Sequence, residues 1–233
     1  MLAVLRREMS NYFTSPIGYI FLAVFYFFSG MFFTNVLAYN STDITNVFSG
    51  LFTVLMFIIP LLTMRSMSEE KKQKTDQLLL TSPIKLGNLV IGKFLAAFII
   101  YCIALAITVV YSVILAVYET PEWSVVVGNI FGALLLGAAL IAIGVFISSL
   151  TENQLIAAIG SFAVMMFIMM IDSFAALIPV EFISNILLKI SFMTRYTDFV
   201  NGILNFANVL FFLSIAVIFN FFTVRILEKK RWS

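Results

Sequence analysis

One short stretch of the sequence has the spacing of a site that binds phosphate. Gly87-Asn-Leu-Val-Ile-Gly92-Lys93 matches most of the pattern G-x-x-x-x-G-K, whose backbone amides and lysine hold the phosphates of a nucleotide. The next residue is Phe94, which cannot supply the hydroxyl that ligates magnesium in such loops, and Leu-Val-Ile favours a helix. We therefore expect a helix here, and no nucleotide bound by this chain.

Other residue types that carry out chemistry are scarce. The sequence has no histidine, which removes the commonest general base, the usual zinc ligand and every Ser-His or Cys-His dyad. Its single cysteine, Cys102, lies in an apolar run and is expected to pack as a small hydrophobe. We predict no catalytic, cofactor or metal site in this chain and no nucleic-acid partner.

The charged segment 65–93 is the most informative part of the chain. Ser66 and Glu69 have the spacing of a capping box, and a polar helix is expected to run from there to the three leucines at 78–80. Leucines at the end of a charged helix need burial against lipid or a protein. We interpret the segment as a docking surface for a protein, with an ordinary solvated loop as the alternative.

These charges are attached to long apolar stretches. Of the 233 residues, 62% are hydrophobic and 11% are charged, whereas a soluble domain has about 25% charged residues. Crossing a hydrocarbon core takes about 20 helical residues. The sequence therefore predicts an all-α integral membrane protein, with a single transmembrane domain over 1–233. The six expected spans are approximately 17–39, 47–64, 94–118, 125–150, 155–171 and 206–224, and every charged residue lies outside them.

A short amphipathic helix is predicted over 2–14, ahead of the first span. Its apolar residues fall largely on one face and its charges elsewhere, which is typical of a helix lying in the membrane interface. Basic residues and a tryptophan also end the last span, and such residues anchor helices at the interface. The anchors that we expect are Arg6, Arg7, Arg225, Arg231 and Trp232.

Between the last two spans, the segment 172–205 is partly apolar and is interrupted by Pro179. It is too broken for a seventh span, so we expect a hairpin of two short helices that dips into or lies on the outer leaflet. Its charged residues either shape an exit path or only solvate the outer face. They are Asp172, Glu181, Lys189, Arg195 and Asp198.

Small residues mark the fourth and fifth spans. In lipid, small side chains let helix backbones approach closely, so these two spans are predicted to pack tightly against one another. The residues assigned to this packing are Gly128, Gly132, Gly137, Gly144 and Gly160.

The distribution of Lys and Arg gives an orientation, because basic loops stay in the cytoplasm. Every lysine and arginine except Lys189 and Arg195 falls at the amino end, in the loop after the second span, or in the C-terminal tail. We expect a multi-pass protein of the inner (plasma) membrane with both termini in the cytoplasm.

Two blocks of sequence together resemble a known family. The first runs from Ser68-Glu69-Glu70-Lys71-Lys72 through Leu78-Leu79-Leu80-Thr81-Ser82-Pro83 to Gly92-Lys93. The second contains Phe199-x-x-Gly202 and Phe222-Thr223-Val224-Arg225-x-Leu227-Glu228-x-x-Arg231-Trp232. The chain resembles the permease subunits of type-2 ABC exporters, and its second block is similar to the GldF-like (gliding-motility) and NosY-like branch.

This resemblance implies a transport component that hydrolyses nothing itself. Two permease subunits, identical or different, would pack about a two-fold axis, and each would dock a separate cytoplasmic ATPase subunit that binds ATP and magnesium. Closure of the ATPase pair would shift the spans and open a path outward, which is a rigid-body switch. The residues expected to dock the ATPase are Glu69, Glu70, Lys71, Lys72, Thr75, Leu78, Leu79 and Leu80.

Two other classes of function stay open at this point. A membrane-embedded enzyme acting on lipids needs a cluster of polar catalytic groups at membrane depth, and the spans offer only scattered Ser, Thr, Tyr and Asn. An ion-coupled carrier or channel should place ionisable residues within its spans, and the predicted spans contain none.

Overall fold

The computed structural model describes residues 1–39, 43–74, 85–118 and 122–232, and all regular secondary structure in these ranges is helical. Among the described residues, six helices are long and apolar enough to cross a membrane. They are α2 (Pro16–Ala38), α3 (Thr45–Thr63), α6 (Leu86–Tyr118), α7 (Trp123–Leu150), α8 (Gln154–Leu177) and α11 (Phe206–Trp232). The chain is an all-α, multi-pass membrane protein, and the predicted fold class is confirmed.

Three of these helices extend well beyond the expected spans. Helix α11 continues to Trp232, and each of the other two takes in a charged residue. Helix α6 begins at Leu86, so Lys93 lies inside the helix, and helix α8 continues to Leu177 and includes Asp172. Both charged groups have partners on other elements, described below. A charged residue can belong to a long apolar helix when such partners surround it.

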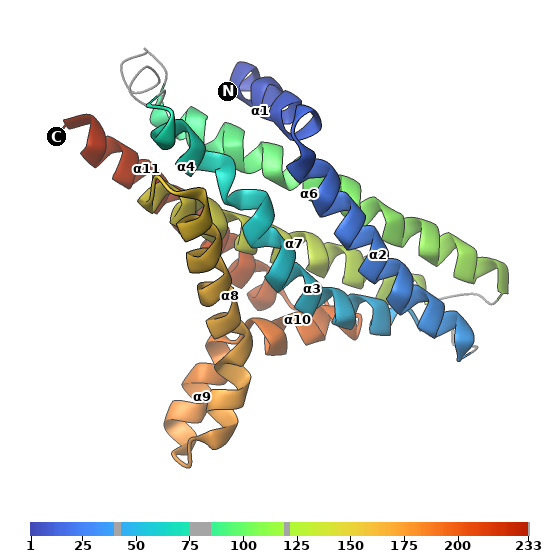
Figure 1. Cartoon of the computed structure of the whole chain (residues 1–233). Coiled ribbons are helices and arrows are strands. Elements are labelled where there is room, and N and C mark those ends of the chain that lie inside the picture. The colour runs from blue at the N-terminus through green and yellow to red at the C-terminus, as the bar shows by residue number, and fades with distance from the viewer. Residues whose placement is uncertain (40–42, 75–84, 119–121, 233) are drawn as a thin grey trace.

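Helix α7 lies at the centre of the bundle (Figure 1) and contacts α3, α4, α6, α8 and α11 together with the short helix α10 (Phe192–Val200). Helix α2 packs against α3 and α6, whereas α11 packs along α7 and α6. Helix α8 diverges from the other spans toward the short helix α9 (Glu181–Ile190), which extends away from the bundle (Figure 1). The hydrophobic core is therefore built around α7.

The small residues of α7 face several different helices. A side chain at Gly132 would meet Phe199 of α10, one at Gly137 would meet the ring of Tyr101 of α6, and one at Gly144 would meet Thr63 of α3. Gly128 lies against Gly202 and Phe199, and only Gly160 of α8 faces α7. Helices α7 and α8 do contact one another, but the assignment of these glycines to that contact holds only for Gly160, because a central helix needs close approach to several neighbours.

The span α3 continues without a break into a short polar helix, α4 (Arg65–Lys72), since the linking residue Met64 is itself helical. The helix ends at Lys72, and Lys74 has a φ of 56°, which is incompatible with a continuing α-helix. The expected polar helix is therefore shorter than predicted, and Ser66 lies inside it without capping it. Inside α3, Pro60 cannot donate a backbone hydrogen bond to the carbonyl of Met56.

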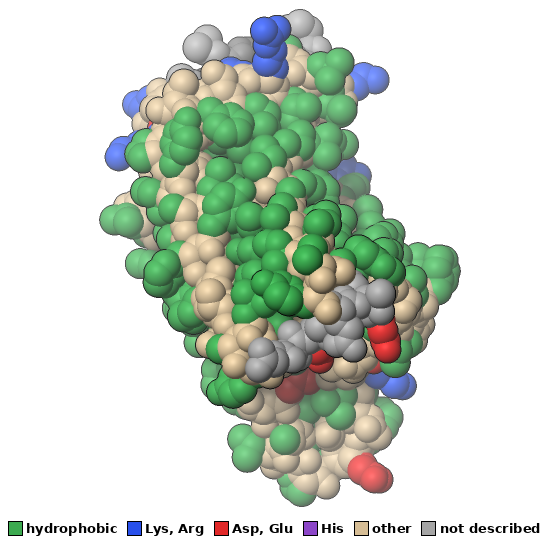
Figure 2. Space-filling model, turned by 90° about the vertical axis from the view of Figure 1, so that its right-hand side faces the viewer, with side chains coloured by type: hydrophobic (Ala, Val, Ile, Leu, Met, Phe, Trp, Pro, Cys, Tyr) green, Lys and Arg blue, Asp and Glu red, His purple; other side chains and the backbone are tan. Residues whose placement is uncertain are grey.

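Short helices lie at both ends of the bundle. Helix α1 (Leu2–Thr14) and α4 lie at the end that carries both termini (Figure 1), whereas α9 and α10 lie toward the other end and form the expected pair of short helices. Figure 2 shows a broad band of apolar side chains on one face, with Lys and Arg gathered at the end of the termini and Asp and Glu toward the opposite end.

Candidate functional site

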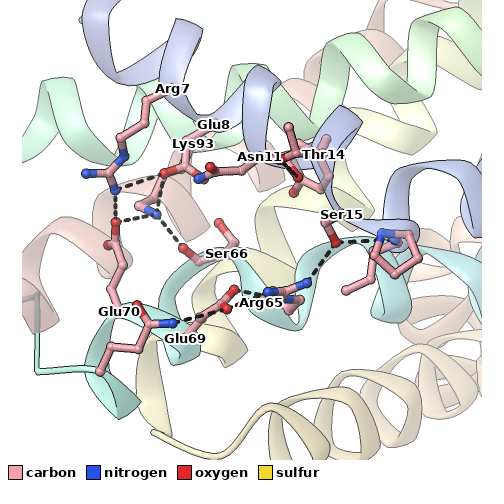
Figure 3. A pocket seen from close by; sticks show the side chains of 14 residues that line it. Arg7, Glu8, Asn11, Thr14, Ser15, Arg65, Ser66, Glu69, Glu70 and Lys93 are labelled. Atoms are coloured by element: carbon pink, nitrogen blue, oxygen red, sulfur yellow. Dashed lines mark hydrogen bonds and ion pairs between the residues drawn. The ribbon is translucent and has the colours of Figure 1, made fainter.

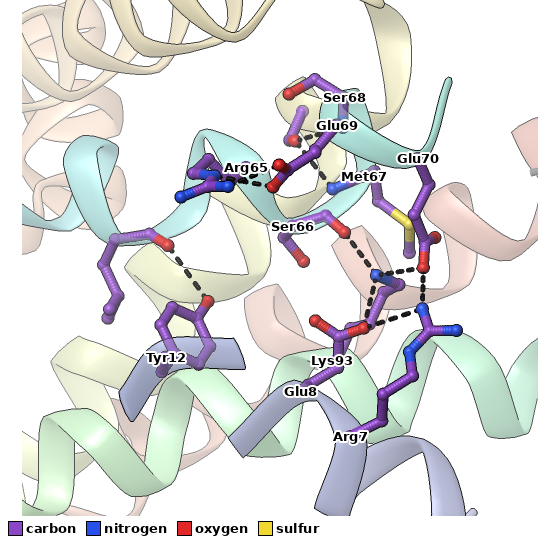
Figure 4. A network of polar contacts seen from close by, with 12 residues as sticks. Arg7, Glu8, Tyr12, Arg65, Ser66, Met67, Ser68, Glu69, Glu70 and Lys93 are labelled. Carbon is purple, nitrogen blue, oxygen red and sulfur yellow. Dashed lines mark hydrogen bonds and ion pairs between the residues drawn. The ribbon is translucent and has the colours of Figure 1, made fainter. Parts of the chain in front are cut away.

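A group of charged side chains, buried except for the half-exposed Arg7, joins three helices at the end of the bundle that carries both termini. Arg7 and Glu8 come from α1, Glu70 from α4 and Lys93 from α6, and all four converge (Figure 4). We call these four residues the charged junction.

Lys93 lies at the centre of the charged junction and is only 2% exposed. Its Nζ atom is 3.0 Å from Oε1 of Glu8 and 3.1 Å from Oε1 of Glu70, and it donates to the backbone oxygen of Ser66 at 2.6 Å. A lysine ammonium has three donors, so these contacts satisfy it completely. One cation thereby links α6 to both α1 and α4.

Arg7 closes the charged junction on its outer side. Its guanidinium forms ion pairs with Glu8, at 3.2 Å, and with Glu70. Burial acts to lower the pKa of Arg7, but the attraction of Glu70 and Glu8 outweighs it and raises the pKa above its ordinary value. The charged junction thus holds two cations and two carboxylates, which is the balance that buried charges require.

Helix α1 reaches this position through a stripe that faces the bundle. Val4 and Glu8, one turn apart, are both buried, and a Cβ at Gly92 would lie 3.0 Å from Cγ1 of Val4. One turn further, Tyr12 donates its hydroxyl to the backbone oxygen of Leu62 at 3.1 Å. Burial raises the pKa of Tyr12, so the phenol keeps its proton. The bundle-facing side of α1 therefore includes the carboxylate of Glu8, whereas the sequence pattern predicted that the charges lie away from the apolar face.

A second charged pair lies beside the charged junction, across an open pocket (Figure 3). Arg65 of α4 donates from Nε to Oε2 of Glu69 at 2.6 Å, and from a terminal nitrogen to Oγ of Ser15 at 2.8 Å. The pocket between α1 and α4 has a volume of about 560 Å³. Its walls carry the charged junction on one side and the Arg65–Glu69 pair on the other.

Helix α4 is also joined to the end of α7. The hydroxyl of Ser148 accepts the backbone N–H groups of Met67 and Ser68, at 3.1 and 3.2 Å, and donates to the backbone oxygen of Met64 at 3.0 Å. Lys71 donates to the backbone oxygen of Ser149. Helix α4 is thus connected to α1, α6 and α7 and continuous with α3.

The residues predicted to dock an ATPase fall into three groups. Glu69, Glu70 and Lys71 contact groups within this chain, whereas Lys72 is exposed at the end of α4. Thr75, Leu78, Leu79 and Leu80 lie outside the described residues. Part of the predicted surface is therefore engaged inside the molecule.

The predicted anchors also differ from one another. Arg7 belongs to the charged junction, and Arg225 pairs with Glu228 at 2.8 Å and lies 4.9 Å from the ring centre of Phe221. Arg6 and Arg231 are exposed. Trp232 ends α11, and its side chain lies outside the described part of the chain.

At the opposite end of the bundle, most of the hairpin charges make specific contacts. Asp172 accepts hydrogen bonds from the hydroxyls of Ser191 and Thr194, at 2.6 and 2.8 Å. Asn208 of α11 accepts from Arg195 at 2.8 Å and donates to Asp198 at 2.6 Å. These bonds attach α10 to α8 and α11. The residues Glu181 and Lys189 are exposed on α9.

Sequence reasoning missed the charged junction, because its members are far apart in the chain. Sequence motifs placed Lys93 at the end of a loop and of the charged segment, and Glu8 was one of the charges predicted to lie off the apolar face of the first helix. The available signal was an unpaired lysine at the start of an apolar helix together with a carboxylate in each of two neighbouring polar helices. Nothing in the sequence singled out Ser148.

Comparison with known families gives a match over nearly the whole chain. Residues 2–232 match the family described as ABC-2 family transporter protein. No curated protein matches the chain.

Proposed function

Because the chain belongs to the ABC-2 transporter family, it is a membrane permease component of an ABC transporter, and we propose that it exports its substrate using a separate cytoplasmic ATPase. ATP and magnesium would be bound by that ATPase. In this proposal the end of the bundle that carries both termini faces the cytoplasm. The concentration of Lys and Arg at that end supports this orientation (Figure 2).

The observation that carries the proposal is the set of connections made by α4. This helix is continuous with α3, shares Lys93 with α1 and α6, and is bonded to Ser148 of α7. A displacement of α4 is therefore transmitted to four other helices at once. Such a packed element shifts as a unit, because close-packed interiors have little freedom to deform continuously.

The contact with the ATPase is proposed to lie at the free end of α4. Lys72, Gln73 and Lys74 are exposed there. The segment that follows contains Thr75 and the three leucines 78–80. Three consecutive leucines need an apolar partner, and a protein docked here would supply one, which supports the same location. A second permease subunit, identical or different, would complete the transporter. Membership of the GldF-like and NosY-like branch stays a prediction.

Docking can be tested by co-purification of the tagged chain with the ATPase encoded beside it. We expect Lys72→Glu to reduce the ATPase recovered several-fold, equivalent to about 1 kcal/mol for a charge at the rim of an interface. Deletion of 78–80 should abolish recovery. Lys229→Glu, at an exposed lysine of α11, is the matched control and should leave recovery unchanged. Full recovery with both the Lys72 variant and the deletion would contradict docking at this site.

Orientation can be tested with single cysteines in a Cys102→Ser background. Ser10 on α1 and Asn185 on α9 are both exposed and lie toward opposite ends of the bundle. In intact cells, a maleimide that cannot cross the membrane should label Asn185→Cys and leave Ser10→Cys unlabelled until the membrane is opened. The reverse pattern would contradict a cytoplasmic amino end.

A further inference from the structure

The pocket between α1 and α4 has the size of a ligand site. Its volume of about 560 Å³ falls in the range of about 300–1,000 Å³ that is common for small-molecule sites. Lys93 and Ser66 lie at its base, and Ser15 and Pro16 border it where α1 passes into α2 (Figure 3).

The pocket lies where two spans change from apolar to polar. Ile17, at the start of the apolar helix α2, lines the pocket, and so does Arg65, the first residue of α4. If α2 and α3 cross the hydrocarbon core, this level corresponds to the lipid head groups. Phe13 and Tyr19 are exposed nearby in the chain and pack edge to face, as aromatic residues often do in the interface.

Two exposed apolar tracks lead from the pocket along the spans. On α2, Ile20 lies one turn beyond Ile17 and is 50% exposed. On α3, Leu61 and Phe57 lie one and two turns before Arg65, on the same helical face, and are 40% and 42% exposed. A molecule whose head occupies the pocket could therefore lay its apolar chains along these tracks.

The charges in the pocket are balanced. The lining contains three cations, Arg7, Arg65 and Lys93, and an equal number of carboxylates, Glu8, Glu69 and Glu70. A ligand with one sign of charge would meet as much repulsion as attraction, whereas a zwitterion can match both signs. A guanidinium recognises phosphate through several parallel donors, and a carboxylate has lone pairs to accept an ammonium even when it is already paired.

The lining also distinguishes two kinds of zwitterionic head group. Quaternary ammonium groups are commonly held by cages of aromatic rings. Among the described lining residues, Tyr12 is the one aromatic side chain, and its hydroxyl is bonded to Leu62. Carboxylates and polar side chains suit a primary ammonium that donates hydrogen bonds.

We propose that this pocket binds the head group of phosphatidylethanolamine, with the phosphate at Arg65, the ammonium at Glu69 and the acyl chains along α2 and α3. The assignment of the lipid to the inner leaflet rests on the proposed function. The bound lipid would contact both α1 and α4. The lipid composition of the membrane would therefore affect the position of α4 directly.

Lipid binding can be measured by native mass spectrometry on the full-length chain, purified in detergent, stripped of lipid and titrated with single lipids. The probes are phosphatidylethanolamine, phosphatidylcholine and phosphatidylglycerol with the same acyl chains. We expect one phosphatidylethanolamine per chain, with at least about tenfold weaker binding of the other two lipids. The double variant R65Q/E69Q should weaken phosphatidylethanolamine binding at least about tenfold.

The matched control is R225Q/E228Q, which removes an exposed pair on α11 away from the pocket and should leave binding unchanged. A second variant, R65E/E69R, keeps an opposite-charge pair at i and i+4 on α4 and so guards against misfolding. It should also weaken binding, because the charges at the two positions are exchanged.

Three results would overturn the proposal: no retained lipid, phosphatidylglycerol binding as tightly as phosphatidylethanolamine, or equal loss in the control and pocket variants. The measurement uses neither the ATPase nor nucleotide. If the chain binds the ATPase but does not bind phosphatidylethanolamine specifically, the lipid site alone is refuted. If it binds the lipid specifically but not the ATPase, the proposed function alone is refuted.

Discussion

The two ends of the bundle hold their short helices by different means. At the end with both termini, α1 and α4 are joined to α6 by formal charges, with one buried lysine between two carboxylates. At the other end, α10 is held mainly by hydrogen bonds of Asp172 and by the neutral Asn208, which lies between Arg195 and Asp198. The first arrangement is a set of ion pairs among α1, α4 and α6. The second is a set of hydrogen bonds that attach α10 to α8 and to α11.

This difference has a consequence for movement. Lys93 pairs with a carboxylate of α1 and with one of α4, and separating these buried charges is costly, so α1, α4 and α6 are constrained to move together. The opposite end contains a less constrained element, because α9 packs mainly on α8 and to a smaller extent on α10, and its Phe182 is 74% exposed. Rigid connections at one end and a loosely held helix at the other suit a protein that receives force at the first end.

The largest effect is expected for Lys93→Met. The substitution leaves Glu8 and Glu70 with Arg7 alone, and breaking a buried ion pair typically costs about 3–5 kcal/mol. The melting temperature of the purified chain in detergent should fall by many degrees. An unchanged melting temperature would show that the charged junction is not an important connection.

A second variant separates stability from transmission. K93M/E70Q leaves Arg7 paired with Glu8, so most of the lost stability should return. The ion pair from α4 to α6 stays broken. In the parent transporter we expect ATP to change the rate at which a maleimide labels Asn185→Cys, and in K93M/E70Q this change should be absent. Recovery of both properties would argue against a role for Lys93 in transmission.

A smaller effect is expected at the opposite end for Asp172→Ala. The buried hydroxyl of Ser191 loses its acceptor, which costs about 1–3 kcal/mol for a group left unsatisfied. The exposed hydroxyl of Thr194 also loses its acceptor but can bond to water. Hydrogen exchange should become faster in α9 and α10 and stay unchanged in α2 and α3. Glu181→Ala, at an exposed carboxylate of α9, is the control and should leave exchange in α10 unaltered. Faster exchange throughout the bundle would contradict a local attachment.

The smallest effect is expected for Ser148→Ala. Two backbone N–H groups of α4 lose an acceptor, yet α4 keeps its ion pairs and its continuity with α3, so we expect a loss of about 1 kcal/mol. Thermal unfolding of the purified chain measures this loss. Ser214→Ala is the control, because the exposed Ser214 hydroxyl bonds only within α11. A loss of stability as large as that caused by Lys93→Met would contradict the expectation that ionic connections stabilise this end more than hydrogen bonds do.

The apolar architecture could be predicted from the sequence because each span is defined by residues close together in the chain. Hydropathy alone located α2 and α7 to within two residues at either end, and Pro16 marked the break between α1 and α2. Pro179 marked the break between α8 and α9, whereas the break between α9 and α10 at Ser191 had no such marker in the sequence.

The charged junction could not be predicted in the same way, because it depends on contacts between distant parts of the chain. Glu8 and Lys93 meet only after α1 folds back along α6, where Gly92 leaves room for Val4. The faces that the glycines of α7 present to their neighbours depend likewise on how several helices are arranged around it. Charge patterns identify a polar helix but not which of its charges face inward.

Pro60 determines where motion of the α3–α4 rod would be concentrated. The missing backbone bond to Met56 creates a point of low bending stiffness, about 18 Å from Lys72 at 1.5 Å per residue. A load applied at Lys72 would then act on a lever arm of that length with its fulcrum at the proline. Residues 45–59 of α3, which lie before the proline, would stay nearly stationary and keep their packing against α7 and α10, while the last few residues of α3 would tilt together with α4.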